Sequence, residues 1–212
     1  MRESVLPSEC IVLEHLQLSN VPRSNVASRT NVDTFWLHSC LDVPPSRPTR
    51  FTSFPFTFGL DDMVMAYPPV RKGTKAIVGF ATQLDSNQYS FLQALDRRLH
   101  ELVLGTLQCQ KTPEKVHWTS IMETGDGLDE GTVKVHLPFN ASRQPMFPLF
   151  QPGQPERKSV HHLAPGARLM VAIDIKTIFC VRPEESKNRT GLYQCGAMVT
   201  LRYAEAVSQE KN

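Results

Sequence analysis

The chain has 212 residues, of which 41% are hydrophobic, and its 23 lysines and arginines nearly balance 21 aspartates and glutamates, for a formal net charge of +2. This length and apolar fraction suit one globular domain, and the scattered charges exclude a histone-like or arm-like basic protein. Any role in nucleic-acid binding must therefore depend on a local patch of cations.

The cysteines and the N-terminus bear on location. The five cysteines (Cys10, Cys40, Cys109, Cys180 and Cys195) form an odd set without a C-x-x-C motif. This pattern favours reduced, mostly core thiols in an intracellular, reducing compartment. The N-terminal residues MRESVLPSEC lack the apolar stretch of a signal peptide, and the longest apolar runs fall far short of the roughly 20 residues that span a bilayer. We therefore expect no membrane association.

The N-terminal part of the chain predicts strands separated by turn-rich and proline-rich loops. Residues 10–18 and 33–41 are predicted strands, the second with Phe35 and Leu37 on the face opposite Trp36 and His38. The prolines of residues 43–59 forbid a central helix and confine any strand there to a sheet edge. Residues 67–73 (YPPVRKG) are predicted as a loop that leads into a strand over 76–84.

One helix is predicted, over residues 87–104. Asp85 or Ser86 offers an N-cap, and Gly105 stands where a glycine typically ends a helix. The apolar residues that follow helical spacing are Phe91, Leu92, Leu95, Leu99, Leu102 and Val103.

The C-terminal part predicts a strand over 132–139 and a long hairpin over 166–181 and 191–206. In the first hairpin strand, Leu169, Val171, Ile173 and Ile175 alternate with Arg168, Met170, Asp174 and Lys176, which predicts one buried and one wetter face. Residues 115–122 are either a short strand or the end of an extended helix, and residues 140–164 form a long excursion.

This order of elements predicts a mainly β fold, specifically an OB-fold-like, partly open β-barrel with one packed α-helix at about 87–104 and long Pro-rich loops. We expect a single domain over residues 1–212, with an OB-like core at about 10–206 and a short flexible C-terminal tail at 207–212.

Signatures of catalysis are missing from the sequence. It contains no phosphate-binding P-loop, no G-x-G-x-x-G and no G-x-S-x-G. The adjacent His161 and His162 point apart in an extended chain, so a shared metal is not expected. Asp61 and Asp62 favour a turn or cap over a divalent-cation site. We therefore predict no catalytic residue, no metal and no cofactor.

Cations and aromatic rings on the predicted strands indicate binding of single-stranded nucleic acid instead. Lys134 and His136 share a strand face, which is either a solvated face or a phosphate contact. Phe179 ends the first hairpin strand and is either a stacking platform or a core residue, whereas Trp36 and Trp118 favour the core. The segments around Arg50 and Arg71 either close over a bound strand or plug the barrel end. The candidate nucleic-acid-binding residues are Lys134, His136, Arg168, Lys176, Phe179, Arg182, Lys187, Arg189, Arg202, Arg50, Phe54, Arg71 and Lys72.

The order of elements resembles the viral single-stranded DNA-binding proteins of T7-like phages and their homologues in large nucleocytoplasmic DNA viruses. The matching pieces extend over about residues 30–206 and are FPFTFGLDD, the strand and helix AIVGF…SFLQALDRRLHELVLGT, the strand VKVHLPF, and the hairpin GARLMVAIDIKTIFC…GLYQCGAMVTLRYAEAV. The resemblance is one of pattern and order.

The resemblance implies an OB-fold core that binds single-stranded DNA without sequence preference. It places groove-lining residues at Lys134, His136, Ile178 and Phe179. The chain departs from the pattern where His136 replaces a stronger cation and where Phe179 alone represents the aromatics near the hairpin turn. Its last residues, VSQEKN, lack the acidic run of the phage proteins, so recruitment of partners through such a tail is not expected.

The leading hypothesis is a non-enzymatic protein that coats unpaired DNA strands in viral replication or recombination. Single-stranded DNA is the expected partner, and replication proteins and a second copy in a homodimer are open partners. The expected locations are the host nucleus or a cytoplasmic viral replication site, with the virion as an open alternative. Two other hypotheses are a structural, minor capsid or assembly protein, and a nuclease that uses Asp61 and Asp62.

Overall fold

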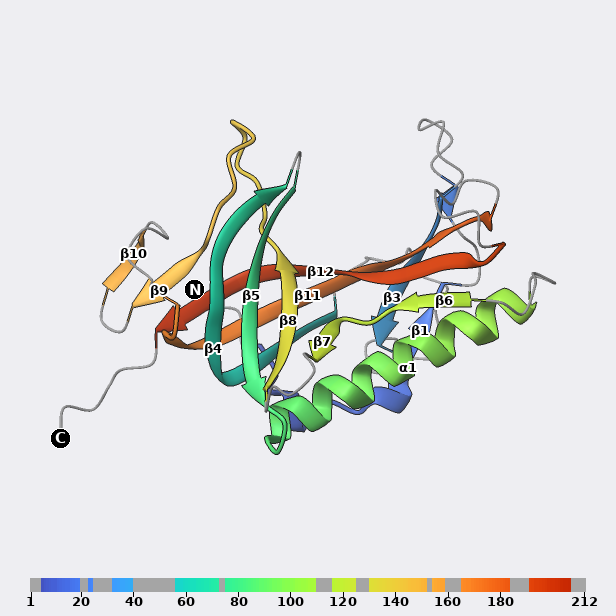
Figure 1. Ribbon diagram of the computed structural model, residues 1–212, viewed down its shortest axis with the longest axis horizontal. Coiled ribbons are helices and arrows are strands. Elements are labelled where there is room, and N and C mark those ends of the chain that lie inside the picture. The colour runs from blue at the N-terminus through green and yellow to red at the C-terminus, as the bar shows by residue number, and fades with distance from the viewer. Residues whose placement is uncertain are drawn as a thin grey trace, which may run out of the picture.

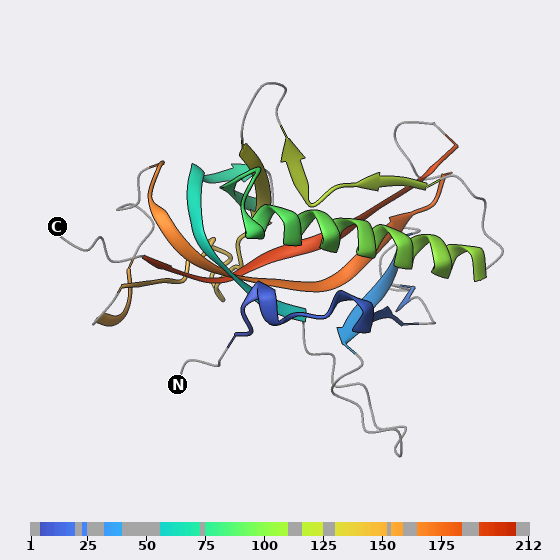
Figure 2. The same cartoon turned by 90° about the horizontal axis from the view of Figure 1, so that it is seen from below.

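The computed structural model describes residues 5–19, 23–24, 32–39, 56–72, 75–109, 116–124, 130–151, 154–158, 165–183 and 191–206. Strands dominate, and one helix, α1 (Asn87–Cys109), lies along the long C-terminal hairpin (Figures 1 and 2). The 3-10 turns are η1 (Ser8–Cys10) and η2 (Leu13–His15). The strands are β1 (Leu16–Leu18), β2 (Arg23–Ser24), β3 (Val32–Ser39), β4 (Phe56–Lys72), β5 (Lys75–Gln83), β6 (Val116–Thr119), β7 (Met122–Thr124), β8 (Glu130–His136), β9 (Leu149–Gln151), β10 (Gln154–Lys158), β11 (Arg168–Val181) and β12 (Tyr193–Ala206).

Five strands close into a ring. The pairing runs from β11 through β4, β5, β8 and β12, and β12 pairs with β11 again. β3 extends the sheet from β11, and β6 pairs in parallel with the first residues of β12. The prediction of a mainly β, OB-like fold with one helix is therefore confirmed. No helix of the described chain has the length and apolar character needed to cross a membrane.

The predicted C-terminal hairpin is β11 and β12, each 14 residues long. Leu169, Val171, Ile173 and Ile175 are completely buried, as their alternation predicts. The register then shifts between Ile175 and Ile178, so that Lys176 and Thr177 together lie opposite the single residue Met198. This is a β-bulge, which reverses the alternation so that Ile178 and Cys180 become the buried residues after it.

The apolar side of helix α1 packs into the core. Leu92, Leu95, Leu99 and Val103 are buried, and the Phe91 ring meets the Phe58 ring of β4 edge-on at 5.3 Å between centroids. At the N-terminus the Ser86 Oγ accepts the Tyr89 backbone N–H at 3.1 Å, so Ser86 fills the predicted role of N-cap.

The predicted end of the helix at Gly105 is wrong. The helix continues to Cys109 because Leu107, one turn after Val103, is also buried. Burial of a leucine is worth about 1.5–3 kcal/mol, which exceeds the cost of about 1 kcal/mol for glycine in a helix.

Other predicted boundaries also change. Residues 10–18 form two 3-10 turns and only the short β1, and residues 67–72 belong to β4 rather than to a loop. β4 accommodates Pro68 and Pro69, which lack a backbone N–H, where its register with β5 shifts between Tyr67 and Val70. Of the two alternatives for 115–122, the strand is correct, and the excursion over 140–164 contains β9 and β10.

Candidate nucleic-acid interface

The side of β3, β11, β12 and β6 that faces away from α1 carries the candidate interface, which we call the open face. Paired residues in neighbouring strands point to the same side of a sheet, and the pairs Phe179–Thr34, Thr177–Trp36 and Gly196–Thr119 lie on this side. None of its defining side chains is buried. The open face is defined by Thr34, Trp36, Thr119, Lys176, Phe179 and Met198.

Phe179 lies against the backbone of β12 on the open face. Its partner across the β11–β12 pair is Gly196, and a Cβ built on that glycine would lie 2.8 Å from Cζ of the ring. The absence of a side chain at position 196 therefore lets the ring lie down on the sheet. The ring is half-buried, so part of it remains accessible to a stacking partner.

Trp36 lies on the neighbouring strand β3 and is also half-buried. Trp36 is the diagonal neighbour of Phe179 across the β3–β11 pair. Diagonal neighbours in paired strands lie about 7–8 Å apart, within reach of aromatic side chains. The Lys176 Nζ lies 4.8 Å from the centroid of the Trp36 ring. Such a cation–π contact at an exposed site is worth about 0.5–1 kcal/mol. The thioether side chain of Met198, 45% exposed, adds an apolar contact to the same face.

Most of the predicted cations with described contacts are held by carboxylates. Lys134 pairs with Glu123, and Arg168 pairs with Asp62 at 3.3 Å. Arg182 donates two hydrogen bonds of 3.2 Å to the carboxylate of Asp33, and Arg202 lies 3.5 Å from Asp174 and donates to Thr57 at 3.1 Å. Within the described chain, no carboxylate is paired with Lys176. The local charge available to a phosphate is therefore smaller than the cation count suggests.

His136 lies on the outer side of β8, where it pairs with Ile77 of β5 and Thr200 of β12. Burial, followed by the positive charge of Lys75, lowers the pKa of His136 below its usual 6.5. The imidazole is therefore mainly neutral at pH 7 and supplies little charge to a phosphate.

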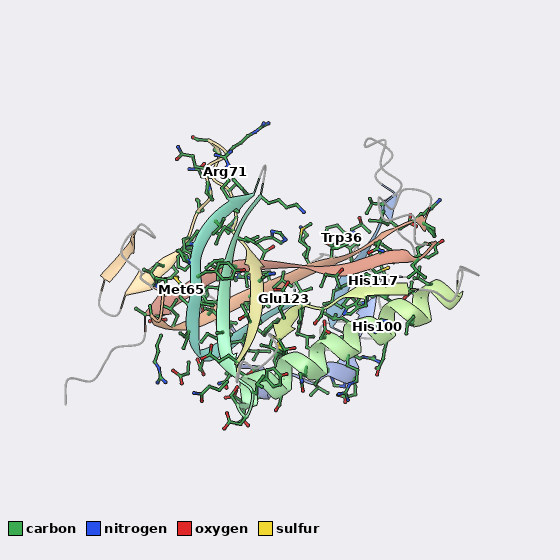
Figure 3. All side chains as sticks on the ribbon, viewed as in Figure 1. Trp36, Met65, Arg71, His100, His117 and Glu123 are labelled. Atoms are coloured by element: carbon green, nitrogen blue, oxygen red, sulfur yellow. The ribbon has the colours of Figure 1, made fainter. Side chains whose placement is uncertain are left out.

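The outer side of β4, β5 and β8 carries a second group of side chains. The Tyr67 ring lies across Gly79, whose partner on β8 is Lys134. Burial raises the pKa of Tyr67, and its hydroxyl is buried without a hydrogen-bond partner among the described residues. Glu123 of β7, which is labelled in Figure 3, pairs with Lys134.

The structure brings some predicted site residues together and separates others. Lys176 and Phe179 share the open face, whereas Lys134 and His136 lie on β8, which meets β12 through the single pair His136–Thr200. Arg168 lies at the far end of β11. Ile178, which the resemblance placed in the groove, is completely buried in the core.

The remaining predicted residues lie away from the open face or outside the description. Arg71 is exposed near the end of β4, well away from Trp36 (Figure 3). Lys72 ends β4, and its side chain is not described. Arg50, Phe54, Lys187 and Arg189 lie outside the described residues.

Sequence reasoning missed Trp36 and Met198 as members of the candidate interface. The sequence favours the core for Trp36, yet the alternation over β3 places it on the face opposite the buried Phe35 and Leu37. Trp118 does lie on the helix side, where its Nε1 donates to Asp96 at 3.0 Å. No cluster of three or more histidine, cysteine or acidic side chains suited to a metal occurs among the described residues.

No model of a protein family and no curated protein sequence matches the chain. Among solved structures, it is similar to gp2.5, a single-stranded DNA-binding protein encoded by bacteriophage T7. The TM-score is 0.44 and the sequence identity 11%, over 72% of this chain and 86% of that chain. A function for this chain must therefore be argued from its own residues.

Proposed function

We propose that this protein binds single-stranded DNA through the open face, without sequence preference, and coats unpaired strands during viral DNA replication or recombination. The observation that carries the proposal is the pair of half-buried rings, Trp36 and Phe179, beside the ammonium of Lys176 on one side of the sheet. Every base has a π-face, so rings of this kind bind unpaired bases at about 1–3 kcal/mol each without selecting a sequence.

The paired cations set the expected strength of binding. Lys134 and Arg168 are paired with carboxylates and lie away from the open face, so they supply little charge to a strand bound there. Affinity should therefore be moderate, with stacking supplying a large share of it.

The test is a titration of a fluorescently labelled dT oligonucleotide followed by anisotropy at a low and a high salt concentration. Trp36→Leu and Phe179→Leu should each weaken binding by about 5- to 150-fold, because each removes one stacking surface worth about 1–3 kcal/mol. Phe139→Leu is the matched control, since Phe139 is exposed but lies outside the open face. Absence of binding at low salt, or equal affinities of all three variants and the wild type, would refute the proposal.

A structural or assembly role is the second candidate. The observation that favours it is the pairing of Lys134, Arg168, Arg182 and Arg202 with carboxylates, which gives a surface of mixed charge. Under this alternative the protein should co-purify with viral particles and should show no binding to DNA in the same titration.

A further inference from the structure

The β-bulge in β11 brings Lys176 to the Trp36 ring. Because the register shifts between Ile175 and Ile178, Lys176 and Thr177 both lie on the open face instead of alternating across it. Thr177 is the residue paired with Trp36, so Lys176 stands one position before that pair. The exposed Lys176 side chain then reaches over the ring, with Nζ 4.8 Å from its centroid.

The ammonium therefore covers a face of the ring that an unpaired base would use. A base stacked on that face has to displace the ammonium, and the same nucleotide carries a phosphate that attracts it. An exposed cation–π contact is the weaker interaction, so the exchange favours the complex. A base inside a duplex is already stacked on both faces and cannot make this exchange without being unpaired.

We propose that Lys176 is an exchangeable cap on Trp36, an inference that rests on the proposed function. In the free protein Lys176 shields the ring, and in the complex a base takes the ring while the Lys176 ammonium turns to a phosphate. Lys176 thus links two events, base stacking and phosphate neutralisation, that an ordinary surface lysine would leave independent.

The test follows the position of the Lys176 ammonium by NMR. Reductive methylation with ¹³C-formaldehyde turns each lysine into a ¹³C-dimethyl-lysine that keeps its positive charge. The Lys176 signal is assigned by its loss in Lys176→Arg. In the free protein it should be shifted upfield by the ring current of Trp36, and Trp36→Leu should abolish that shift. Lys75, exposed on β5, provides the control signal without an upfield shift.

Saturation with a dT oligonucleotide, followed in parallel by anisotropy, should move the Lys176 signal out of the upfield region. In addition, Lys176→Met should make the plot of log affinity against log salt shallower by about 0.7, the contribution of one phosphate contact to a single strand. Lys75→Met should leave that slope unchanged.

The outcomes separate this proposal from the proposed function. A Lys176 signal that is not upfield in the free protein, or that stays upfield in a complex shown by anisotropy to be saturated, overturns the cap while DNA binding stands. If anisotropy detects no complex at low salt, the proposed function has failed and the exchange fails with it.

Discussion

Gly196 and Phe179 face each other across the β11–β12 pair, and the ring occupies the space that a side chain at position 196 would need. A Cβ on Gly196 would come within 2.8 Å of Cζ and 3.2 Å of Cε1 of Phe179, and within 3.3 Å of the Thr119 Cβ. Contacts this short force a neighbour to move. Gly196 therefore fixes how the Phe179 ring lies on the open face.

Gly196→Ala should lift the Phe179 ring away from β12. We expect weaker binding of a dT oligonucleotide and a loss of about 1–3 kcal/mol in the free energy of unfolding, the usual cost of an added methyl group in a close-packed place. The measurements are anisotropy and urea denaturation of the same preparation. The double variant Gly196→Ala/Phe179→Leu should regain stability but not affinity. Unchanged affinity in Gly196→Ala would mean that the orientation of the ring has no role in binding.

The lowered pKa of His136 makes stability depend on pH. In the unfolded chain this histidine titrates near 6.5, and in the folded protein burial and Lys75 hold the pKa lower. Between the folded and the unfolded pKa of His136, the unfolded state binds more protons than the folded state. The free energy of unfolding therefore rises with pH and levels off above about pH 6.5.

His136→Gln should therefore flatten the rise of unfolding free energy with pH below about pH 6.5, where the unfolded state binds more protons than the folded state. Urea denaturation at several pH values measures this rise. Burial raises the pKa of Asp174, so at the lower pH where carboxylates titrate the folded state binds more protons than the unfolded state. In that range Asp174 makes stability fall as pH rises, which is the opposite of the effect of His136. An identical slope in wild type and variant would contradict the burial of His136.

Arg182 and Asp33 form an ion pair that is expected to matter for stability as well as for charge. The Asp33 side chain is 10% exposed and receives both hydrogen bonds from Arg182, whose side chain is 46% exposed. Arg182→Met leaves the carboxylate without this partner, at an expected cost of about 1–3 kcal/mol. Asp33→Asn in the Arg182→Met background should cost less than Asp33→Asn in the wild type.

A double-mutant cycle measured by chemical denaturation checks this coupling. Arg168→Met is the matched control, because its pair with Asp62 is 63% and 57% exposed and its loss should change stability by less than about 0.5 kcal/mol. If Arg182→Met behaves like Arg168→Met, the Arg182–Asp33 pair has no structural role.

Much of the fold could be predicted from the sequence, because the alternation of β11 and β12 and the helical spacing of α1 are properties of neighbouring residues. The β-bulge at Lys176 could not, since an extra residue in one strand is defined only by its partner strand. The ion pairs could not be predicted for a related reason. Asp33 and Arg182 are 149 positions apart in the chain, and only the β3–β11 pairing brings them together.

Gly105 provides a test of the helix end that the sequence pattern misplaced. It lies inside α1, its φ is not in the left-handed region, and a Cβ there would meet no heavy atom within 4 Å. Gly105→Ala should therefore stabilise the protein by about 0.5–1 kcal/mol, because alanine loses less backbone freedom than glycine on entering a helix. Urea denaturation measures the change. If residue 105 instead ended the helix in a left-handed conformation, the same substitution would destabilise the protein, so the sign of the change distinguishes a helix that continues to Cys109 from one that stops at Leu104.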